Sequence, residues 1–223
     1  MLFALLISLY IAVLLLLSSL TLARRYSVSL SQPKQMFKKH PKYCIFLMVF
    51  FLALVSVSAI YIFNEDISGL ILQARWVTLI VGLYLVTWTD YFERKIPNIY
   101  LLILLAIRVA FWIYEIIIGR EFIKLAVGTP LIGAAIGPGI MLLGILISRK
   151  GVGMGDVKMF LVIGFFVGSN QIIPSMFYTF LFSAIFGIFL LITKKATTKD
   201  SLPMAPFALL GVLAEYVSLV LGG

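Results

Sequence analysis

The sequence predicts an all-α integral membrane protein with about eight transmembrane helices and both termini on the extracytoplasmic side. Three observations support this fold class. Of the 223 residues, 62% are hydrophobic and only 12% are charged, which is about half the charged fraction of a soluble domain. Several uncharged runs reach the roughly 20 residues that a helix needs to cross a bilayer. The runs are continuous rather than alternating, which favours helices over a closed barrel.

The apolar runs define the candidate spans in chain order. In the first, the basic pair Arg24 and Arg25 follows the apolar segment, which indicates a transmembrane helix rather than a cleavable signal peptide. The third contains Arg75 near its outer end, and the sixth is short, with a possible extension to Ile173. The eight spans are Leu2–Ala23, Tyr43–Phe63, Leu70–Thr89, Ile99–Ile118, Leu125–Ile147, Met159–Gly168, Ile173–Thr193 and Pro203–Leu221.

The basic residues orient these spans. Most of the 18 Lys and Arg residues fall in alternate loops, which the positive-inside rule assigns to the cytoplasm. The net charge of +9 therefore reflects orientation in the lipid bilayer. It does not indicate nucleic-acid binding, because no basic patch carries interleaved aromatic residues. The cytoplasmic segments are Arg24–Lys42, Arg94–Lys95, Arg149–Lys158 and Lys194–Lys199, whereas Arg75, Arg120 and Lys124 lie outside and Arg108 lies within the fourth span.

We expect two parts in the chain. Residues 1–66 form two transmembrane helices joined by a short basic cytoplasmic loop, and residues 67–223 form a six-helix core. Cys44 is the only cysteine and His40 the only histidine. A single cysteine makes neither an internal disulfide nor a cysteine-rich zinc site. No ligand constellation in the sequence supports a metal site, so we expect no bound metal.

Two of the nine acidic residues call for more than a solvated role. Asp90 closes the third span and Asp156 opens the sixth, so both lie at the cytoplasmic boundary. A carboxylate at such a boundary is expected to face the bundle interior or a wet cavity. The others, Glu115 and Glu215 among them, fall in loops or at outer helix ends, where solvation is sufficient.

Two carboxylates that share a site cannot both ionise easily, and the pair then holds one proton near neutral pH. One member takes a proton from water while the other donates to the carbonyl oxygen, which is the chemistry of aspartic proteases. Two alternatives remain for Asp90 and Asp156. They are ordinary charges at a membrane boundary, or part of an ion or proton pathway.

The residues around the two aspartates fit an accessible site. Gly153 and Gly155 remove side chains beside Asp156 and permit close approach of another backbone, as an extended peptide substrate requires. Pro97 suits the start of the fourth helix. Lys158 lowers the pKa of Asp156, steers an acidic substrate group, or only marks the cytoplasmic side. A phosphate-binding loop is disfavoured because the Gly-Lys-Ser/Thr ending is missing.

The segment Gly153-Met154-Gly155-Asp156-Val157-Lys158 resembles the GxGD motif of the type IV prepilin peptidase family. Asp90 followed by Ile96-Pro97-Asn98 resembles the first aspartate motif of that family. The stretch from Pro203 to Gly211 is similar to the proline-containing stretch near the family's C-terminus. The order and spacing of the three motifs also fit.

This resemblance implies a multi-pass aspartic endopeptidase of the bacterial inner membrane. Such enzymes remove the short basic leader of type IV prepilins and pseudopilins at the cytoplasmic face, and they need no cofactor. The resemblance makes Asp90 and Asp156 the catalytic pair. The residues that bind substrate or shape the site are then Gly153, Gly155, Lys158, Pro97 and Asn98.

One departure from the family concerns the interval between the first two spans. Many bacterial members carry there a cytoplasmic domain with paired cysteines, and they also methylate the new N-terminus. In this chain the interval is only Arg24–Lys42, without a cysteine pair, which predicts a peptidase that does not methylate. A presenilin-like intramembrane protease, which shares GxGD, and an ion-coupled transporter remain the alternatives.

Overall fold

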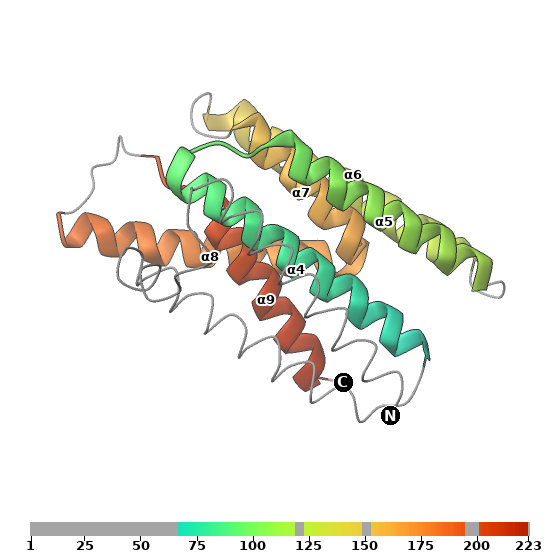
Figure 1. Ribbon diagram of the computed structural model, residues 1–223. Helices are drawn as coiled ribbons and strands as arrows, with labels where there is room; N and C mark the ends of the chain where they lie inside the picture. Colours follow the sequence, from blue (N-terminus) through green and yellow to red (C-terminus); the bar gives the residue numbers. More distant parts are fainter. Residues whose placement is uncertain (1–66, 119–122, 149–152, 195–200, 223) are drawn as a thin grey trace, which may run out of the picture. The chain divides into compact units, whose positions relative to one another are not determined.

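The computed structural model describes residues 67–118, 123–148, 153–194 and 201–222. The chain divides into two compact units, Met1–Val77 and Thr78–Gly223. The contacts between helices and the site described below belong to the second unit. The expected division at residue 66 stays a prediction. Over the described residues, the helices are α4 (Ile67–Glu93), α5 (Asn98–Ile118), α6 (Ile123–Ser148), α7 (Met154–Val167), α8 (Ser169–Ile192) and α9 (Ala205–Gly222), as labelled in Figure 1.

Three of the described helices are long and apolar enough to cross a membrane. They cover Asn98–Ile117, Gly128–Ile147 and Ser169–Ile192, and they coincide with the predicted fourth, fifth and seventh spans. The helices α4, α7 and α9 correspond to the third, sixth and eighth predicted spans. They are not among the helices that are both long and apolar enough to cross a membrane. The first two predicted spans lie outside the described residues. The prediction of an all-α membrane protein is thus confirmed, whereas the number of eight spans and the side of the termini stay predictions.

The α7 helix differs from the predicted sixth span at both ends. It begins at Met154 rather than Met159 and ends at Val167. At Gly168 the backbone turns with φ 84°, a conformation that glycine adopts without steric cost, and α8 starts directly afterwards at Ser169. The 14 residues of α7 extend about 21 Å, so α7 alone is shorter than the roughly 30 Å hydrocarbon core.

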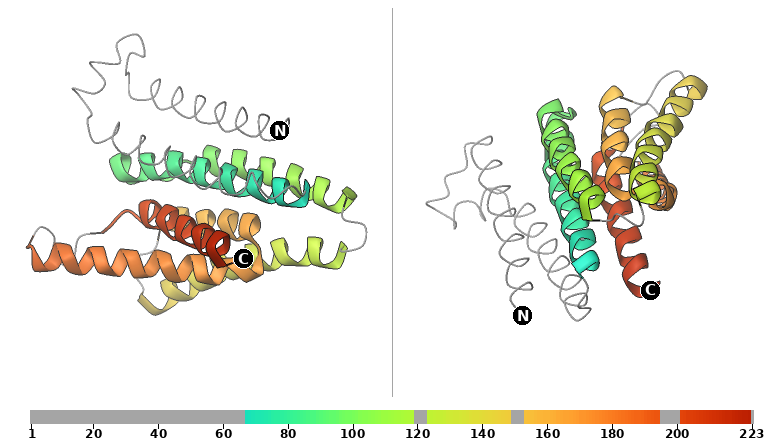
Figure 2. Two further views of the ribbon diagram at one scale, coloured as in Figure 1. Left: turned by 90° about the horizontal axis from the view of Figure 1, so that it is seen from below. Right: turned by 90° about the vertical axis from the view of Figure 1, so that its right-hand side faces the viewer.

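The α7 helix contacts α5, α6 and α8, and α9 packs along α8 (Figures 1 and 2). The crossing of α6 with α7 is made by backbone atoms. A β carbon at Gly133 would overlap the carbonyl oxygen of Gly164, and one at Gly164 would overlap the carbonyl oxygen of Gly133. Small residues of this kind let membrane helices approach closely. Phe160 and Ile163 of α7 are fully buried.

Two acidic residues do not have the solvated surroundings expected from the sequence. Glu115 lies within α5, with its side chain 18% exposed and in an ion pair with Arg108. Glu215 is buried in α9, at 6% exposure. Glu115 lies in the last turn of α5, as expected for a helix end, whereas Glu215 lies inside α9, which continues to Gly222.

Candidate active site

Asp90 lies in the last turn of α4 and is buried. Its Oδ2 accepts a hydrogen bond of 3.0 Å from the backbone N–H of Ala205, the first residue of α9. The N–H groups of the first helical turn have no partner within their own helix. A carboxylate from another helix therefore caps the start of α9, where the helix dipole also favours negative charge.

Arg94 directly follows the last residue of α4, and its side chain binds the segment that precedes α9. Its backbone adopts φ 53°, and its N–H donates to the Asp90 carbonyl at 3.0 Å. This left-handed residue closes the helix in the manner of a C-terminal cap. The Arg94 guanidinium donates to the carbonyl of Ser201. The end of α4 is consequently fastened to the chain that leads into α9 (Figure 1).

Asp156 lies in the first turn of α7. Its Oδ2 accepts a hydrogen bond of 3.2 Å from the N–H of Gly153, the residue that precedes the helix. This is one half of a capping box, and the reciprocal half is missing because Gly153 has no side chain. A β carbon at Gly153 would lie 3.3 Å from the same carboxylate oxygen. The glycine thus leaves the space beside the carboxylate open.

Two contacts join the Asp90 loop to the Asp156 segment. A β carbon at Gly155 would lie 3.2 Å from the Cβ of Ile96, so this glycine permits the loop after α4 to approach the start of α7. The ammonium of Lys158 donates to the Oδ1 of Asn98 at 3.3 Å. Both segments lie at the same end of the helices (Figure 1). Residues far apart in the sequence are therefore brought together at one site.

The electrostatics couple the two aspartates, which both lie outside the predicted spans. Burial raises the pKa of Asp156 from 3.8 to about 6, opposed by the Gly153 hydrogen bond and reinforced by the negative charge of Asp90. Burial also raises the pKa of Asp90, whereas hydrogen bonds from the Ala205 and Met204 backbone and the charge of Arg94 act to lower it. The carboxylate of Asp90 is thus held by more donors than that of Asp156.

The other predicted site residues lie at the same end. Pro97 directly precedes α5, and its carbonyl accepts the N–H of Tyr100 at 3.2 Å. Lys158 bonds to Asn98, and its charge is not among the causes that set the pKa of Asp156. The backbone donors of Met204 and Ala205 had no predicted role. The only signal for them was the proline-containing stretch itself. In the part of the chain that the structure describes, no group of three or more His, Cys, Asp or Glu residues gathers at a metal-binding distance.

The fold and the site define a helical membrane protein with two interacting carboxylates at one end of its helices. The family profile described as the type IV leader peptidase family matches residues 77–192, which include both aspartates. The chain belongs to this family, which confirms the resemblance seen in its motifs.

A comparison with characterised proteins agrees. The chain is 33% identical over 87 residues to the prepilin leader peptidase/N-methyltransferase of Bacillus subtilis (strain 168). This match covers 39% of the chain and 35% of the relative, so the chain spans well under two thirds of that protein. No solved structure matches the chain.

Proposed function

We propose that this protein is a membrane-embedded aspartic endopeptidase that removes the short basic leader of type IV prepilins or pseudopilins at the cytoplasmic face. One observation carries the proposal. Asp90 and Asp156 interact electrostatically, and the pKa of Asp156 rises to about 6. Two carboxyl groups that share one proton near neutral pH are suited to hydrolyse a peptide bond. Family membership supports the same reaction.

The surroundings of the two carboxyl groups suggest different roles. Asp90, with its backbone donors and Arg94, is the ionised general base that takes a proton from water. Asp156 carries the shared proton and donates it to the oxygen of the scissile carbonyl as the water oxygen attacks the carbon. The tetrahedral intermediate then collapses and the C–N bond breaks. The amine leaves with a proton returned from Asp90, and the proton on the former carbonyl oxygen returns to Asp156.

The remaining site residues bind or shape the substrate in this account. Gly153 keeps a side chain away from Asp156, which leaves room for an extended peptide, and Gly155 makes room for Ile96 of the loop after α4. The Lys158 and Asn98 pair holds the start of α5 against the start of α7, and Pro97 directly precedes α5. With eight spans and both termini outside, this end of the helices faces the cytoplasm of a bacterial inner membrane. The short interval Arg24–Lys42 without paired cysteines supports a peptidase that does not methylate its product.

Co-expression with a prepilin-like precursor tests the proposal. Leader loss is followed by mass spectrometry for the wild type, Asp90→Asn and Asp156→Asn. Each amide keeps the shape of the carboxyl but cannot share its proton, so we expect both variants to accumulate and to lose nearly all cleavage. The exposed Glu93→Gln, in the same turn of α4, is the matched control and should cleave normally.

The position of the cut identifies the substrate class. A cut between the basic leader and the hydrophobic helix supports a leader peptidase, whereas a cut inside the hydrophobic helix supports a presenilin-like protease. Normal cleavage by either Asn variant would refute the aspartate pair. Methylation is tested by incubating the purified enzyme with S-adenosylmethionine, and an N-methylated product would refute that part of the proposal.

A further inference from the structure

Arg108 is a buried cation in the middle of an apolar helix. It lies ten positions after Asn98, the first residue of α5, which corresponds to about 15 Å along the helix axis. This distance is about half the thickness of the hydrocarbon core. The Arg108 side chain is fully buried. A charge at this depth is costly unless it is paired, and such residues generally have a specific role.

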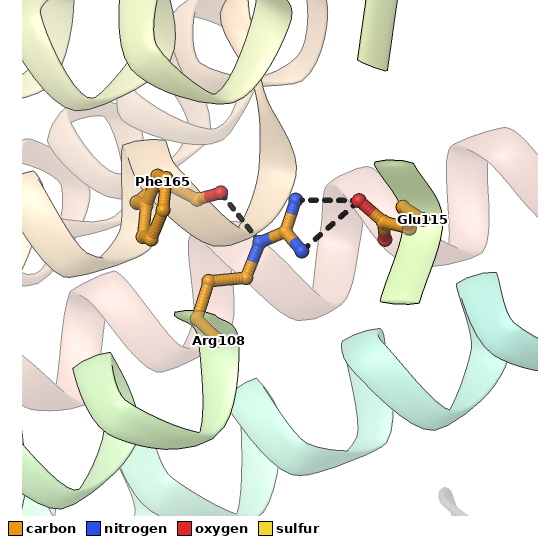
Figure 3. Close-up of polar contacts among 3 residues, drawn as sticks. All are labelled: Arg108, Glu115 and Phe165. Atoms are coloured by element: carbon orange, nitrogen blue, oxygen red, sulfur yellow. Dashed lines mark hydrogen bonds and ion pairs between the residues drawn. The ribbon is translucent and has the colours of Figure 1, made fainter. Parts of the chain in front are cut away.

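Figure 3 shows the hydrogen bonds of the Arg108 guanidinium to Phe165 and Glu115. Its Nε donates to the carbonyl oxygen of Phe165 at 2.8 Å. Its Nη1 and Nη2 both donate to the Oε2 of Glu115, each at 3.1 Å. The guanidinium also lies 5.2 Å from the centre of the Phe165 ring, within cation–π range. Arg108 therefore binds the backbone of α7 and is neutralised from its own helix.

The carbonyl that Arg108 binds is at the C-terminal end of α7. Phe165 is in the last turn, since α7 ends at Val167 and the chain turns at Gly168. The last four carbonyls of a helix have no partner within it, and a cation there is favoured by the helix dipole. Arg108 thus caps the end of α7 opposite to the end where Asp156 lies. The acidic Asp156 therefore lies at the N-terminal end of α7 and the basic Arg108 at its C-terminal end, and both charges have the sign that the helix dipole favours.

The contact of α7 with α6 differs in kind from its contact with α5. The Gly133 and Gly164 backbones touch directly, which sets the distance between α6 and α7. The Arg108 hydrogen bond, in contrast, joins one atom of α5 to one atom of α7. Together with the Lys158 to Asn98 contact, it links α5 and α7 at two heights.

We propose that Arg108 is a positioning residue for the reaction, which sets the height of α7 against α5 and so keeps Asp156 level with Asp90. The inference rests on the proposed function. A displacement of about 1 Å at a reacting group can lower a rate by about 100-fold. A shift of α7 by a single residue would move Asp156 by about 1.5 Å and rotate it about 100°.

The test compares purified variants in lipid nanodiscs on a prepilin-like substrate. Arg108→Met keeps an unbranched side chain similar in length to the aliphatic part of arginine but loses its donors. We expect its kcat, per folded molecule, to fall by about 10- to 100-fold with little change in KM. Arg108→Lys, which retains a donor for the Phe165 carbonyl, should recover part of the loss. Val109→Met, at the neighbouring and more exposed position, is the matched control and should keep the wild-type kcat.

The double variant Arg108→Met/Glu115→Met distinguishes a positioning role of Arg108 from a role in stability alone. In the double variant neither member of this ion pair is left without the other, so folding yield and thermal stability should recover relative to Arg108→Met. The kcat should stay low, because the Phe165 carbonyl still lacks its donor. Recovery of wild-type kcat in the double variant would overturn the inference.

The pH profile provides a second readout. Asp90 contributes to the raised pKa of Asp156, so a displaced α7 weakens this coupling. We expect the alkaline limb of the activity profile to move to lower pH in Arg108→Met. Suppose that wild type cleaves and that neither Asp90→Asn nor Asp156→Asn does. If Arg108→Met then has the kcat and the alkaline limb of wild type, only the role of Arg108 is refuted. A wild type that does not cleave would refute the proposed function instead.

Discussion

The substitution Ala205→Pro removes the hydrogen bond that the backbone N–H of Ala205 donates to Asp90. Ala205 is the first residue of α9, and the first N–H bonds within that helix, from Phe207 and Ala208, go to the carbonyl of Met204. The N–H of Ala205 therefore has no role inside the helix and donates to Asp90 at 3.0 Å. Proline is well tolerated at the first helical position.

The size of the effect follows from the charge on the acceptor. A hydrogen bond to a charged group contributes about 1.5–3 kcal/mol, and 1.36 kcal/mol corresponds to about one pKa unit. Loss of the donor disfavours the ionised form of Asp90, so its pKa rises by about 1–2 units. The Met204 donor and Arg94 remain, which keeps the base partly functional.

The assay is the pH dependence of kcat/KM, which reports the ionisation of the free enzyme. The acidic limb follows the base, and in Ala205→Pro it should move upward by about 1–2 pH units. The acidic limb then approaches the alkaline limb, which lies near the pKa of Asp156, about 6. The bell-shaped pH profile of kcat/KM therefore becomes narrower, and its maximum falls. Ala205→Gly retains the N–H and is the matched control. An acidic limb that stays in place, or that moves equally in both variants, would refute the assignment of Asp90 as the base.

Two further predictions concern stability. At Gly133, alanine would overlap the Gly164 carbonyl, and we expect a loss of about 1–3 kcal/mol. Gly139→Ala on the same helix meets no atom within 4 Å and should be neutral or slightly stabilising. Equal unfolding temperatures for the Gly133→Ala and Gly139→Ala variants would contradict the close crossing of α6 and α7.

The raised pKa of Asp156 means that the folded state binds more protons than the unfolded state between pH 3.8 and about 6. The free energy of unfolding should therefore fall as pH rises through that window. Asp156→Asn removes this contribution, and thermal unfolding that is equally pH-dependent in both proteins would argue against it.

The helices were largely predictable because they are long apolar runs. The predicted span Ile99–Ile118 coincides with α5, Asn98–Ile118, within one residue. The α7 helix was less predictable, since its start lies in the polar GxGD segment and its end depends on the backbone turn at Gly168. Hydropathy is insensitive to such a turn when the residues on both sides are apolar.

The sequence singled out the two aspartates because each lies where an apolar run ends or begins, but it did not predict their hydrogen-bond partners. The donor to Asp90 is a backbone N–H, at Ala205, and no side chain in the sequence marks such a group. The role of Arg108 also depends on a backbone atom, the carbonyl of Phe165. A charged residue within an apolar span was visible, and Glu115 seven positions later lies on the same helical face. The pairing of the two was nevertheless missed, because Glu115 was interpreted as solvated.

The central claim is that Asp90 and Asp156 act as a single catalytic unit. Cleavage rates of Asp90→Asn, Asp156→Asn and the double variant on one prepilin-like substrate test it most directly. Residues that act as a unit are strongly non-additive, so the account predicts that either single substitution costs about as much as both together. A double variant much slower than either single one, with losses that multiply, would show that the two aspartates act independently and would contradict the account.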